Sequence, residues 1–565
     1  MYENYEARRR LGGRARLLRA FLVLLVAALL ATGVYLFLTW GEVTRPVANN
    51  DGVKQVSSVV NGRLAIYEGE SWQPRFWNGI DLGATLPGYA PGDLAPTKED
   101  YLRWFPQMEE MNVDVLRVYT ILPPHFYEAL EEFNSTREDP LWLIQGVWSP
   151  EEELTGEDEL GRDAYTPEIT EKFENEISDA VHVVHGDANL PETFGHASGE
   201  FETDVSRYML GWMVGTEWYP YAVKVTDEAN RDTPLYYGEY FRATEEATPF
   251  ESWLAQMLDA LAKEEMEYGW QHPVALTNWP TTDPLSHPNE PNGQEDLVSV
   301  DPMHLTPTSA WSAGYYASYH IYPAYPDFLR YEERYQTYRD AKGEINPYAG
   351  YLNEMRAHHE GVPLVISEFG VPSSRAMARR GPLERNQGFY TEEEQGEVDA
   401  DLLESIRSEG YDGGILFAWQ DEWFKTTWNT TDLETPSKRR IKWRNRLTPE
   451  ENFGVIAVEP GESVEEMLLL DGETDDWQQR ETVSSQEYPD FDLSVTHDEA
   501  NLYLLARKKG GVWDFSEEEL DIGFGVLPGG SRTADQAPGV TFSEGIQLLL
   551  KIKGEEDSQL FINSG

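Results

Sequence analysis

The feature that most constrains the fold is an alternation of short apolar runs with amphipathic segments between residues 63 and 460. The runs have the length and composition of buried strands. Several segments between them repeat apolar residues at three- and four-residue spacing, which is typical of helices that cover a sheet. Strands that alternate with helices predict a parallel sheet. The eight runs are residues 75–83, 113–120, 141–148, 208–218, 273–279, 316–323, 363–370 and 413–420.

Eight such units predict an α/β chain folded as a closed (β/α)8 TIM barrel with long loops. The alternative is a doubly wound open sheet, but no glycine-rich phosphate loop follows the first run. Thr97 stands where a helix N-cap is expected, and Gly361 and Gly410 stand where helices end. The predicted helices are residues 98–111, 167–184, 249–269, 348–361 and 391–410.

The N-terminus predicts a membrane anchor. Residues 1–20 contain six arginines, and residues 21–40 contain no charged residue. A helix of twenty apolar residues spans roughly 30 Å, the thickness of a bilayer core, and the arginines before it predict a cytoplasmic N-terminus. We therefore expect a transmembrane signal anchor at residues 21–40, a polar stalk at 41–62, and the rest of the chain outside the cytoplasm at the cell membrane. The alternative is a long signal peptide that is cleaved to secrete the protein.

The charge excludes several classes of partner and site. With 100 Asp and Glu against 45 Lys and Arg, the formal net charge is −55. Such a field repels nucleic acid, so we expect no nucleic-acid partner. The even spread of acidic residues favours a halophilic protein, and the alternative is an ordinary acidic extracellular enzyme. The absence of cysteine excludes disulfides, thiolate metal sites and a cysteine nucleophile. No spacing of His, Asp and Glu indicates a catalytic metal, and no cofactor is expected.

Two predicted strands end in a carboxylate. The fourth ends in "GTEW" with Glu217, and the seventh ends in "ISEFG" with Glu368. Chemistry in a TIM barrel takes place at the carboxyl ends of the strands, so the two glutamates are expected to face each other across the barrel mouth. A charge at the tip of an apolar run is costly without partners, and Arg117 and Tyr322 end other strands. Taken alone, each glutamate could also be a solvated loop residue or a helix cap.

Paired carboxylates of this kind suit retaining glycoside hydrolysis, which needs two carboxyl groups roughly 5–5.5 Å apart. One carboxyl group attacks the anomeric carbon, while the other protonates the leaving oxygen and then activates water. Tryptophan rings offer flat apolar platforms for the C–H faces of a sugar. The other candidates at strand ends for substrate binding or support are Tyr119, Thr216, Asn278, His320, Trp419 and Asp421.

The motifs "WNGIDLG", "LRVY", "GTEW", "SYHIYP", "ISEFG" and "FAWQDEW", in this order over about residues 70–430, resemble clan A of the glycoside hydrolases, which contains families 2, 5 and 72. This resemblance implies that Glu217 is the acid/base and Glu368 the nucleophile. It also implies supporting roles for Arg117, Tyr322 and Trp419, which match clan positions. Most members have Asn before the acid/base, whereas this chain has Thr216.

The resemblance implies hydrolysis of a β-linked poly- or oligosaccharide by double displacement. A β-glycan transglycosylase would use the same residues, and a non-catalytic surface glycan-binding protein is a further alternative. The sequence does not distinguish these activities, and it does not identify the sugar.

The pattern changes after residue 460. Residues 461–565 contain strand-like stretches with period-two alternation and no helical period, beginning with "DFDLSVTHDEANLYLLARKK". They predict a small all-β sandwich, which could be incomplete at its C-terminal end. The stretch resembles family 9-like carbohydrate-binding modules, and the alternative is an accessory sandwich that does not bind sugar.

Overall fold

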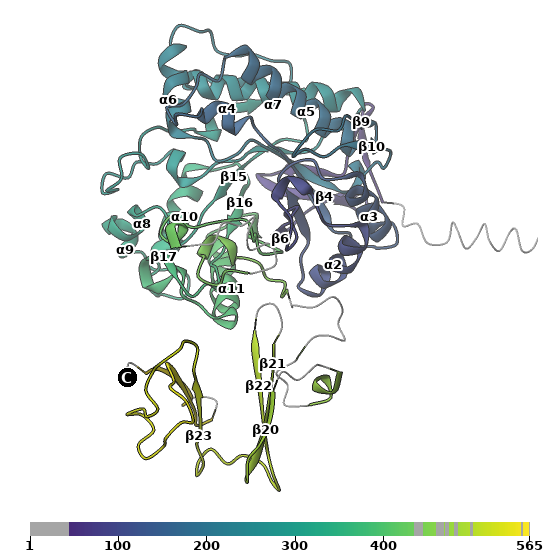
Figure 1. Cartoon of the computed structure of the whole chain (residues 1–565). Helices are drawn as coiled ribbons and strands as arrows, with labels where there is room; N and C mark the ends of the chain where they lie inside the picture. Colours follow the sequence, from purple (N-terminus) through teal and green to yellow (C-terminus); the bar gives the residue numbers. More distant parts are fainter. Residues whose placement is uncertain are drawn as a thin grey trace, which may run out of the picture. The chain divides into compact units, whose positions relative to one another are not determined.

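The computed structural model describes residues 45–433, 444–458, 468, 474–479, 484–497, 501–554 and 557–563. The chain divides into two compact units, residues 1–457 and 458–565, each considered by itself (Figure 1). The anchor predicted at residues 21–40 lies outside the described residues. In the part of the chain that is described, no helix has the length and apolar character needed to cross a bilayer.

The first unit is a closed barrel of eight parallel strands that follow one another around the barrel in chain order (Figure 1). Each of the eight predicted runs contains one of these strands, so the prediction of a TIM barrel is confirmed. The strands are β6 (Trp77–Asp81), β7 (Val115–Val118), β8 (Trp142–Val147), β11 (Met209–Val214), β13 (Val274–Leu276), β15 (Tyr315–His320), β16 (Leu364–Phe369) and β19 (Gly413–Leu416).

All five predicted helices form. Thr97 caps the first of them by accepting a hydrogen bond from the backbone N–H of Asp100, as expected. Gly361 and Gly410 follow helix ends with φ of +87° and +85°, a conformation that favours glycine. The longer helices are α2 (Lys98–Glu110), α3 (Pro124–Asn134), α5 (Pro167–Val184), α6 (Pro220–Ala229), α7 (Pro249–Glu267), α10 (Pro347–His358) and α11 (Glu392–Ser408), and the short ones are α4 (Glu151–Thr155), α8 (Phe328–Tyr331) and α9 (Glu333–Gln336).

Small antiparallel pairs fill the loops of the barrel. One pair precedes β11, one links the segment before α7 to the long connection between β13 and β15, and one lies in the loop after β16. They are β9 (Ala188–Leu190) with β10 (Gly199–Phe201), β12 (Phe241–Ala243) with β14 (Leu305–Pro307), and β17 (Met377–Arg379) with β18 (Gln387–Gly388).

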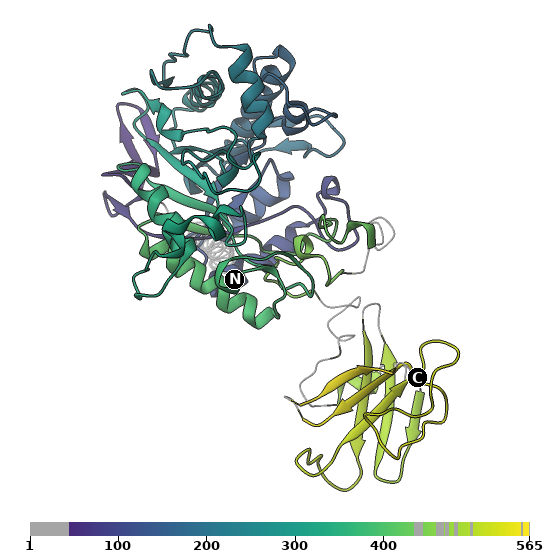
Figure 2. The same ribbon diagram turned by 90° about the vertical axis from the view of Figure 1, so that its left-hand side faces the viewer.

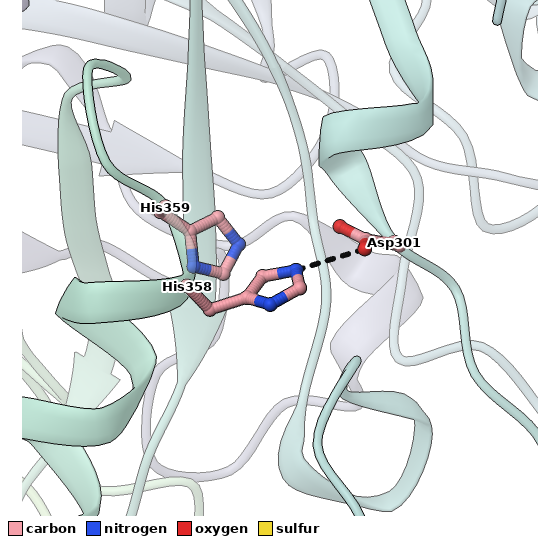
Figure 3. A group of neighbouring side chains, drawn as sticks. All are labelled: Asp301, His358 and His359. Carbon is pink, nitrogen blue, oxygen red and sulfur yellow. Dashed lines mark hydrogen bonds and ion pairs between the residues drawn. The ribbon is translucent and has the colours of Figure 1, made fainter. Parts of the chain in front are cut away.

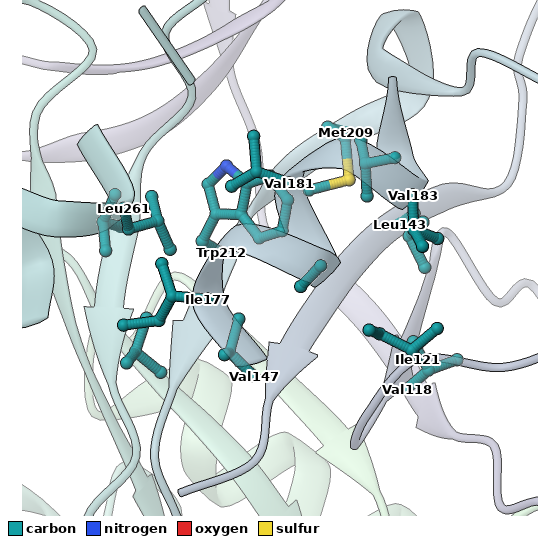
Figure 4. Close-up of a cluster of buried hydrophobic side chains, with 14 of the residues drawn as sticks. Val118, Ile121, Leu143, Val147, Ile177, Val181, Val183, Met209, Trp212 and Leu261 are labelled. Carbon is teal, nitrogen blue, oxygen red and sulfur yellow. The ribbon is translucent and has the colours of Figure 1, made fainter. Parts of the chain in front are cut away.

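The main core lies between the barrel and its helices. Trp212 of β11 is fully buried among Ile177 and Val181 of α5 and Leu261 of α7 (Figure 4). Burial of such side chains contributes about 1.5–3 kcal/mol each relative to leaving them in water. The outward-facing side chains of the strands thereby fix the helices around the barrel.

The predicted stalk at residues 41–62 is wrong over its described part. Residues 48–60 form strands at the amino-terminal end of the barrel, where Val56 and Leu64 are buried with Trp77 and Tyr316 from the barrel strands. The polar composition of this segment concealed its few apolar positions, of which Val56 is buried in the core. The strands that form this floor are β1 (Ala48–Asn50), β2 (Val53–Gln55), β3 (Ser57–Val60), β4 (Arg63–Glu68) and β5 (Ser71–Pro74).

A cavity mutation tests the role of this floor. Leu64→Ala is expected to lower the free energy of unfolding of the barrel by about 2–5 kcal/mol, because it removes a fully buried side chain. Val47→Ala is the control: Val47 is 36% exposed, so this change is expected to cost no more than about 0.5 kcal/mol. Chemical denaturation measures both values. Equal effects of the two changes would contradict the packing of the floor against the barrel.

An ion pair ties α5 to the loop between β9 and β10. Nε2 of His196 lies 2.9 Å from Oε2 of Glu176, and Nδ1 lies 2.8 Å from the carbonyl oxygen of Ala197. The hydrogen bond with Glu176 raises the pKa of His196 to about 9. The protonated ring can donate from both nitrogens, so this geometry suits the charged form.

This ion pair predicts a dependence of stability on pH. The pKa of His196 lies above its unfolded value of about 6.5, so its contribution to stability is complete below about pH 6.5 and is lost as the pH rises to about 9. We expect the thermal midpoint to fall less between these pH values in His196→Gln than in the native chain. His125→Gln is the control, since the His125 ring is hydrogen-bonded to the neutral carbonyl oxygen of Pro96 and forms no ion pair with a described residue. If the thermal midpoint of His196→Gln fell with pH as steeply as that of the native chain, the ion pair would not contribute to the pH dependence of stability.

The second unit is built from strands (Figure 2). It contains two three-stranded antiparallel sheets, and in the first of them residues 491–497 pair with residues 502–508. An all-β unit was expected here, and the packing of the sheets as a sandwich stays a prediction. The strands are β20 (Ser484–Glu487), β21 (Phe491–His497), β22 (Leu502–Lys508), β23 (Leu520–Phe524), β24 (Leu548–Ile552) and β25 (Gln559–Ile562).

Candidate active site

The two predicted glutamates lie at the carboxyl-terminal mouth of the barrel. Glu368 is the second-last residue of β16, and Glu217 lies three residues after the end of β11. His320 ends β15 between them. The parallel strands bring all of these side chains to one end of the barrel, where TIM-barrel enzymes carry their active sites.

Glu368 is a buried carboxylate with three partners. Oε1 lies 3.1 Å from Nη1 of Arg117 and 3.4 Å from Nε2 of His320, while Oε2 accepts a hydrogen bond of 2.8 Å from the hydroxyl of Tyr322. Burial alone would raise the pKa of Glu368, but the His320 ring, the Arg117 guanidinium and the Tyr322 hydroxyl together lower it below its ordinary value. Glu368 is therefore held ionised, as a nucleophile requires.

Glu217 is more open to solvent, with 37% of its side chain exposed. Its Oε1 lies 2.8 Å from Nδ1 of His320. An ionised carboxylate can only accept, so Nδ1 carries a hydrogen and donates it to Glu217, while Nε2 of the same ring faces Oε1 of Glu368 and lies 3.2 Å from Nη2 of Arg117. The two glutamates are thus linked through one histidine ring.

The separation of the carboxylates bears on the chemistry. One oxygen of Glu217, one oxygen of Glu368 and a His320 nitrogen all lie within 4.8 Å of one another. Retaining glycosidases hold their carboxyl groups about 5–5.5 Å apart, whereas inverting enzymes leave about 6.5–9.5 Å for a water molecule. The spacing therefore agrees with direct attack by one carboxylate.

Asp81 is a residue of this site that the sequence did not single out. It ends β6, is fully buried, and its Oδ1 lies 2.9 Å from the same Nη1 of Arg117 that contacts Glu368. The guanidinium thus stands between two carboxylates, and Nη1 also donates to the carbonyl oxygen of Ser367. Asp81 lies within the motif "WNGIDLG", but its partner is 36 residues away and becomes evident only in the fold.

Trp419 does not form the expected sugar platform. Only 3% of its surface is exposed, and its ring packs against Trp104 in the core. Phe417 instead lies beside Tyr322, which donates to Glu368; the two ring centroids are 6.3 Å apart, and Phe453 completes this aromatic cluster. The order "FAW" in the sequence did not reveal which ring turns toward the mouth.

Tyr119 does lie with the predicted site residues. Its ring supports the Arg117 guanidinium at 4.4 Å, and its edge contacts the half-exposed Trp148 at the end of β8. Its hydroxyl is buried and has no hydrogen-bond partner among the described residues.

Three other predicted residues have structural partners. Thr216 is buried and its hydroxyl lies 2.7 Å from that of Ser149. Asn278 holds the loop after β13 through the carbonyl oxygen of Val300. Asp421 is buried against Arg444, and desolvation by burial raises the pKa of Asp421 to about 6. None of these contacts reaches Glu217 or Glu368.

Two groups of described side chains bring metal-binding atoms together. The first group consists of Glu217, His320 and Glu368. In it, Glu368 already pairs with the positively charged guanidinium of Arg117, which takes the place that a metal cation would have. In the second, Nε2 of His358 lies 2.8 Å from Oδ2 of Asp301, beside His359 (Figure 3).

Both ring nitrogens of His359 are already used. Nδ1 donates to the carbonyl oxygen of Met355 at 2.7 Å, and Nε2 accepts from the hydroxyl of Tyr319 at 3.0 Å. Neither group is thus a free set of ligands, and the expectation that no metal takes part stays a prediction.

Comparison with known proteins gives distant similarities of structure. No family model and no curated protein matches the chain. The similar solved structures include beta-glucuronidase 2 of Bacteroides uniformis (12% identity, 67% of this chain and 33% of that chain, TM-score 0.36) and a GH2 beta-galacturonidase from Eisenbergiella tayi (12%, 71% and 50%, 0.39). An endo-1,4-beta-mannanase from Rhizomucor miehei is similar at 11% identity, over 64% of this chain and 90% of that chain, with a TM-score of 0.37.

This chain spans a third to a half of the length of the first two of these structures. Because the identities and TM-scores are low, the fold is established by the barrel itself. The function has to be inferred from the geometry of the two carboxylates and their partners.

Proposed function

We propose that the chain is a retaining glycoside hydrolase that cleaves a β-linked poly- or oligosaccharide. The observation that carries this proposal is the pair Glu217 and Glu368. One carboxylate oxygen of each lies within 4.8 Å of the other, Glu368 is buried against the Arg117 guanidinium, and Glu217 is open to solvent. The environments of the two carboxylates differ in the way that an acid/base and a nucleophile require.

In the first step, a carboxylate oxygen of Glu368 attacks the anomeric carbon, and the bond from that carbon to the leaving oxygen breaks. The proton on Glu217 passes to the leaving oxygen. Because His320 donates to Oε1 of Glu217, the proton has to be carried by Oε2. His320 therefore orients the acid, while Arg117 and Tyr322 hold the nucleophile.

In the second step, the ionised Glu217 takes a proton from water, and the water oxygen bonds to the anomeric carbon. The bond between that carbon and Glu368 breaks, and both residues return to their starting states. A sugar hydroxyl in place of water would make the same site a transglycosylase. A non-catalytic glycan-binding protein is the other candidate, and it is favoured by Thr216, which stands in place of asparagine and already has a partner in Ser149.

The test is covalent labelling. A panel of 2-deoxy-2-fluoro β-glycosides with activated leaving groups is incubated with the chain, and peptides are analysed by mass spectrometry. We expect one label, on the peptide that contains Glu368, and an NMR time course of hydrolysis in which the β-anomer appears first. Labelling of another carboxylate, or first appearance of the α-anomer, would contradict the mechanism.

We further propose that residues 21–40 anchor the enzyme and that the second unit binds sugar. The uncharged run behind six arginines supports the first proposal, and the all-β fold supports the second. External protease added to intact cells is expected to digest residues beyond 60.

A further inference from the structure

The loop after the nucleophile strand has an unusual charge for this chain. In a protein of net charge −55, residues 370–391 contain four arginines and a single acidic residue, Glu384. The loop begins two residues after Glu368 and includes the β17–β18 hairpin. Positive charge is therefore concentrated on this loop, while the chain as a whole is strongly acidic.

A second loop carries another arginine to the same place. The backbone N–H of Arg375 donates to the carbonyl oxygen of Arg446 at 2.7 Å, and that of Ser373 donates to Asn452 at 2.9 Å. Asn429 also donates to the carbonyl oxygen of Met377. The loops after β16 and β19 are thus joined, and we call Arg375, Arg379, Arg380 and Arg446 the arginine rim.

No side chain of the arginine rim forms an ion pair with a described residue, and Arg446 acts on the Asp421 carboxylate through its charge alone. Arg375, Arg380 and Arg446 are exposed, and their guanidinium groups form no ion pair there; Arg379 lies over the ring of Tyr325 at 4.4 Å. Neighbouring arginines behave differently, because Arg385 pairs with Asp401 and Arg444 pairs with Asp421. In a chain with 100 acidic residues, Arg375, Arg379 and Arg380 thus have no described carboxylate within ion-pair distance and can pair with another anion.

Aromatic rings connect the arginine rim to the catalytic pair. The Tyr325 ring beneath Arg379 lies 6.1 Å from the Trp279 ring, and Nε1 of Trp279 donates to the carbonyl oxygen of Trp218, the neighbour of Glu217. Phe389 and Trp428, on the same two loops, are 73% and 71% exposed. Exposed rings beside guanidinium groups suit a sugar chain that carries negative charge.

We propose that the arginine rim binds an anionic β-linked glycan, so that the substrate carries carboxylate or sulfate groups along its chain. This inference rests on the proposed function, which supplies the class of polymer, a β-linked glycan. The arginine rim supplies the reason to expect negative charge on that polymer. Guanidinium groups pair with both anions through two parallel N–H donors.

The overall charge does not prevent such binding. The Debye length is about 8 Å at physiological ionic strength, so acidic residues farther away are largely screened. A bound anion responds to the guanidinium groups it touches. A long polyanion such as DNA extends past the mouth over acidic surface, which disfavours it.

The experiment measures binding by calorimetry on the full chain with Glu368→Gln, which prevents turnover. The probes are oligomers of β-1,4-glucuronan and β-1,4-mannuronan, their carboxyl-reduced neutral forms, and the same neutral forms sulfated at C6. The test variant replaces Arg375, Arg379 and Arg380 with Gln. The matched control is Arg207→Gln, an exposed arginine directly before β11 at the opposite end of the barrel.

We expect at least one anionic oligomer to bind more tightly than its neutral parent, and the triple variant to lose roughly 10–100-fold of that affinity, because each exposed charge pair contributes a few-fold. Arg207→Gln should bind as before, and a DNA oligonucleotide of equal charge should not bind. Preference for uronate or for sulfate identifies the anion.

Equal binding of neutral and anionic oligomers, no binding of any anionic oligomer, or equal affinity of the triple variant would overturn the inference. The two proposals fail separately. Arginine-dependent binding by a chain that cleaves no glycan contradicts the hydrolase, whereas cleavage of neutral glycans at rates independent of the arginine rim contradicts the anionic substrate.

Discussion

Glu368→Gln is expected to lower turnover of every glycoside substrate by roughly 10⁴-fold or more, because it removes the atom that bonds to the anomeric carbon. The amide keeps the size of the carboxylate, but it is neutral and cannot compensate the Arg117 charge. Steady-state kinetics with activated and natural glycosides measure the loss. Glu384→Gln is the control, since Glu384 is exposed on the loop that follows the same strand, and its activity should stay within about two-fold of the native value.

Glu217→Ala should fail in a different way. The loss should be about 10²–10⁴-fold for natural glycosides, whose leaving group needs a proton. Dinitrophenyl glycosides need none, so their first step should remain fast and a covalent intermediate should accumulate. Azide is small enough to replace the missing side chain, and it should restore turnover and give a β-glycosyl azide.

The contrast between the two variants is the decisive result. An α-glycosyl azide would show that the substrate is not β-linked or that the mechanism inverts. Equal loss in both variants with all leaving groups would remove the distinction between acid/base and nucleophile. Near-normal activity of Glu368→Gln would show that Glu368 is a buried structural carboxylate and not the nucleophile.

The sequence predicted the barrel because its signals are local. Each strand is a short apolar run, and helix starts such as Thr97 are marked by capping residues, so periodicity and caps located these elements. The pairing of Glu217 with Glu368 was predicted from position at strand ends, since a closed parallel barrel brings all carboxyl ends to one mouth. The fold confirms their proximity, whereas their roles stay predictions.

The parts that the sequence did not reveal depend on contacts between distant residues. Asp81 acquires its role only through Arg117, on the neighbouring strand. The choice between Phe417 and Trp419 depends on how the chain turns after β19 ends at Leu416, where strand periodicity no longer applies. The floor of the barrel was mistaken for a stalk because Val56 is one of few apolar residues in a polar segment.

Asp81→Asn is expected to weaken the barrel and to shift the pH profile of catalysis. The Arg117 guanidinium is buried between Asp81 and Glu368, and breaking one side of a buried ion pair costs about 3–5 kcal/mol when a charge is left uncompensated. Here Glu368 still compensates Arg117, so the cost in unfolding free energy should fall near or below the lower end of that range. Thermal and chemical unfolding measure it.

The pH profile separates a positioning role from a merely structural one. Burial raises the pKa of Asp81, the negative charge of Glu368 raises it further, and this interaction between the two carboxylates is mutual. Loss of the Asp81 charge should therefore lower the pKa of Glu368 further, and the acidic limb of kcat/KM, which reports ionisation of the free nucleophile, should move to lower pH. Asp114→Asn is the matched control, because Asp114 lies at the opposite end of the neighbouring strand, where it accepts a hydrogen bond from the backbone N–H of Asn78. A loss of stability with an unmoved acidic limb would show that Asp81 supports the fold alone, and a shift to higher pH would contradict the arrangement of two carboxylates around one guanidinium.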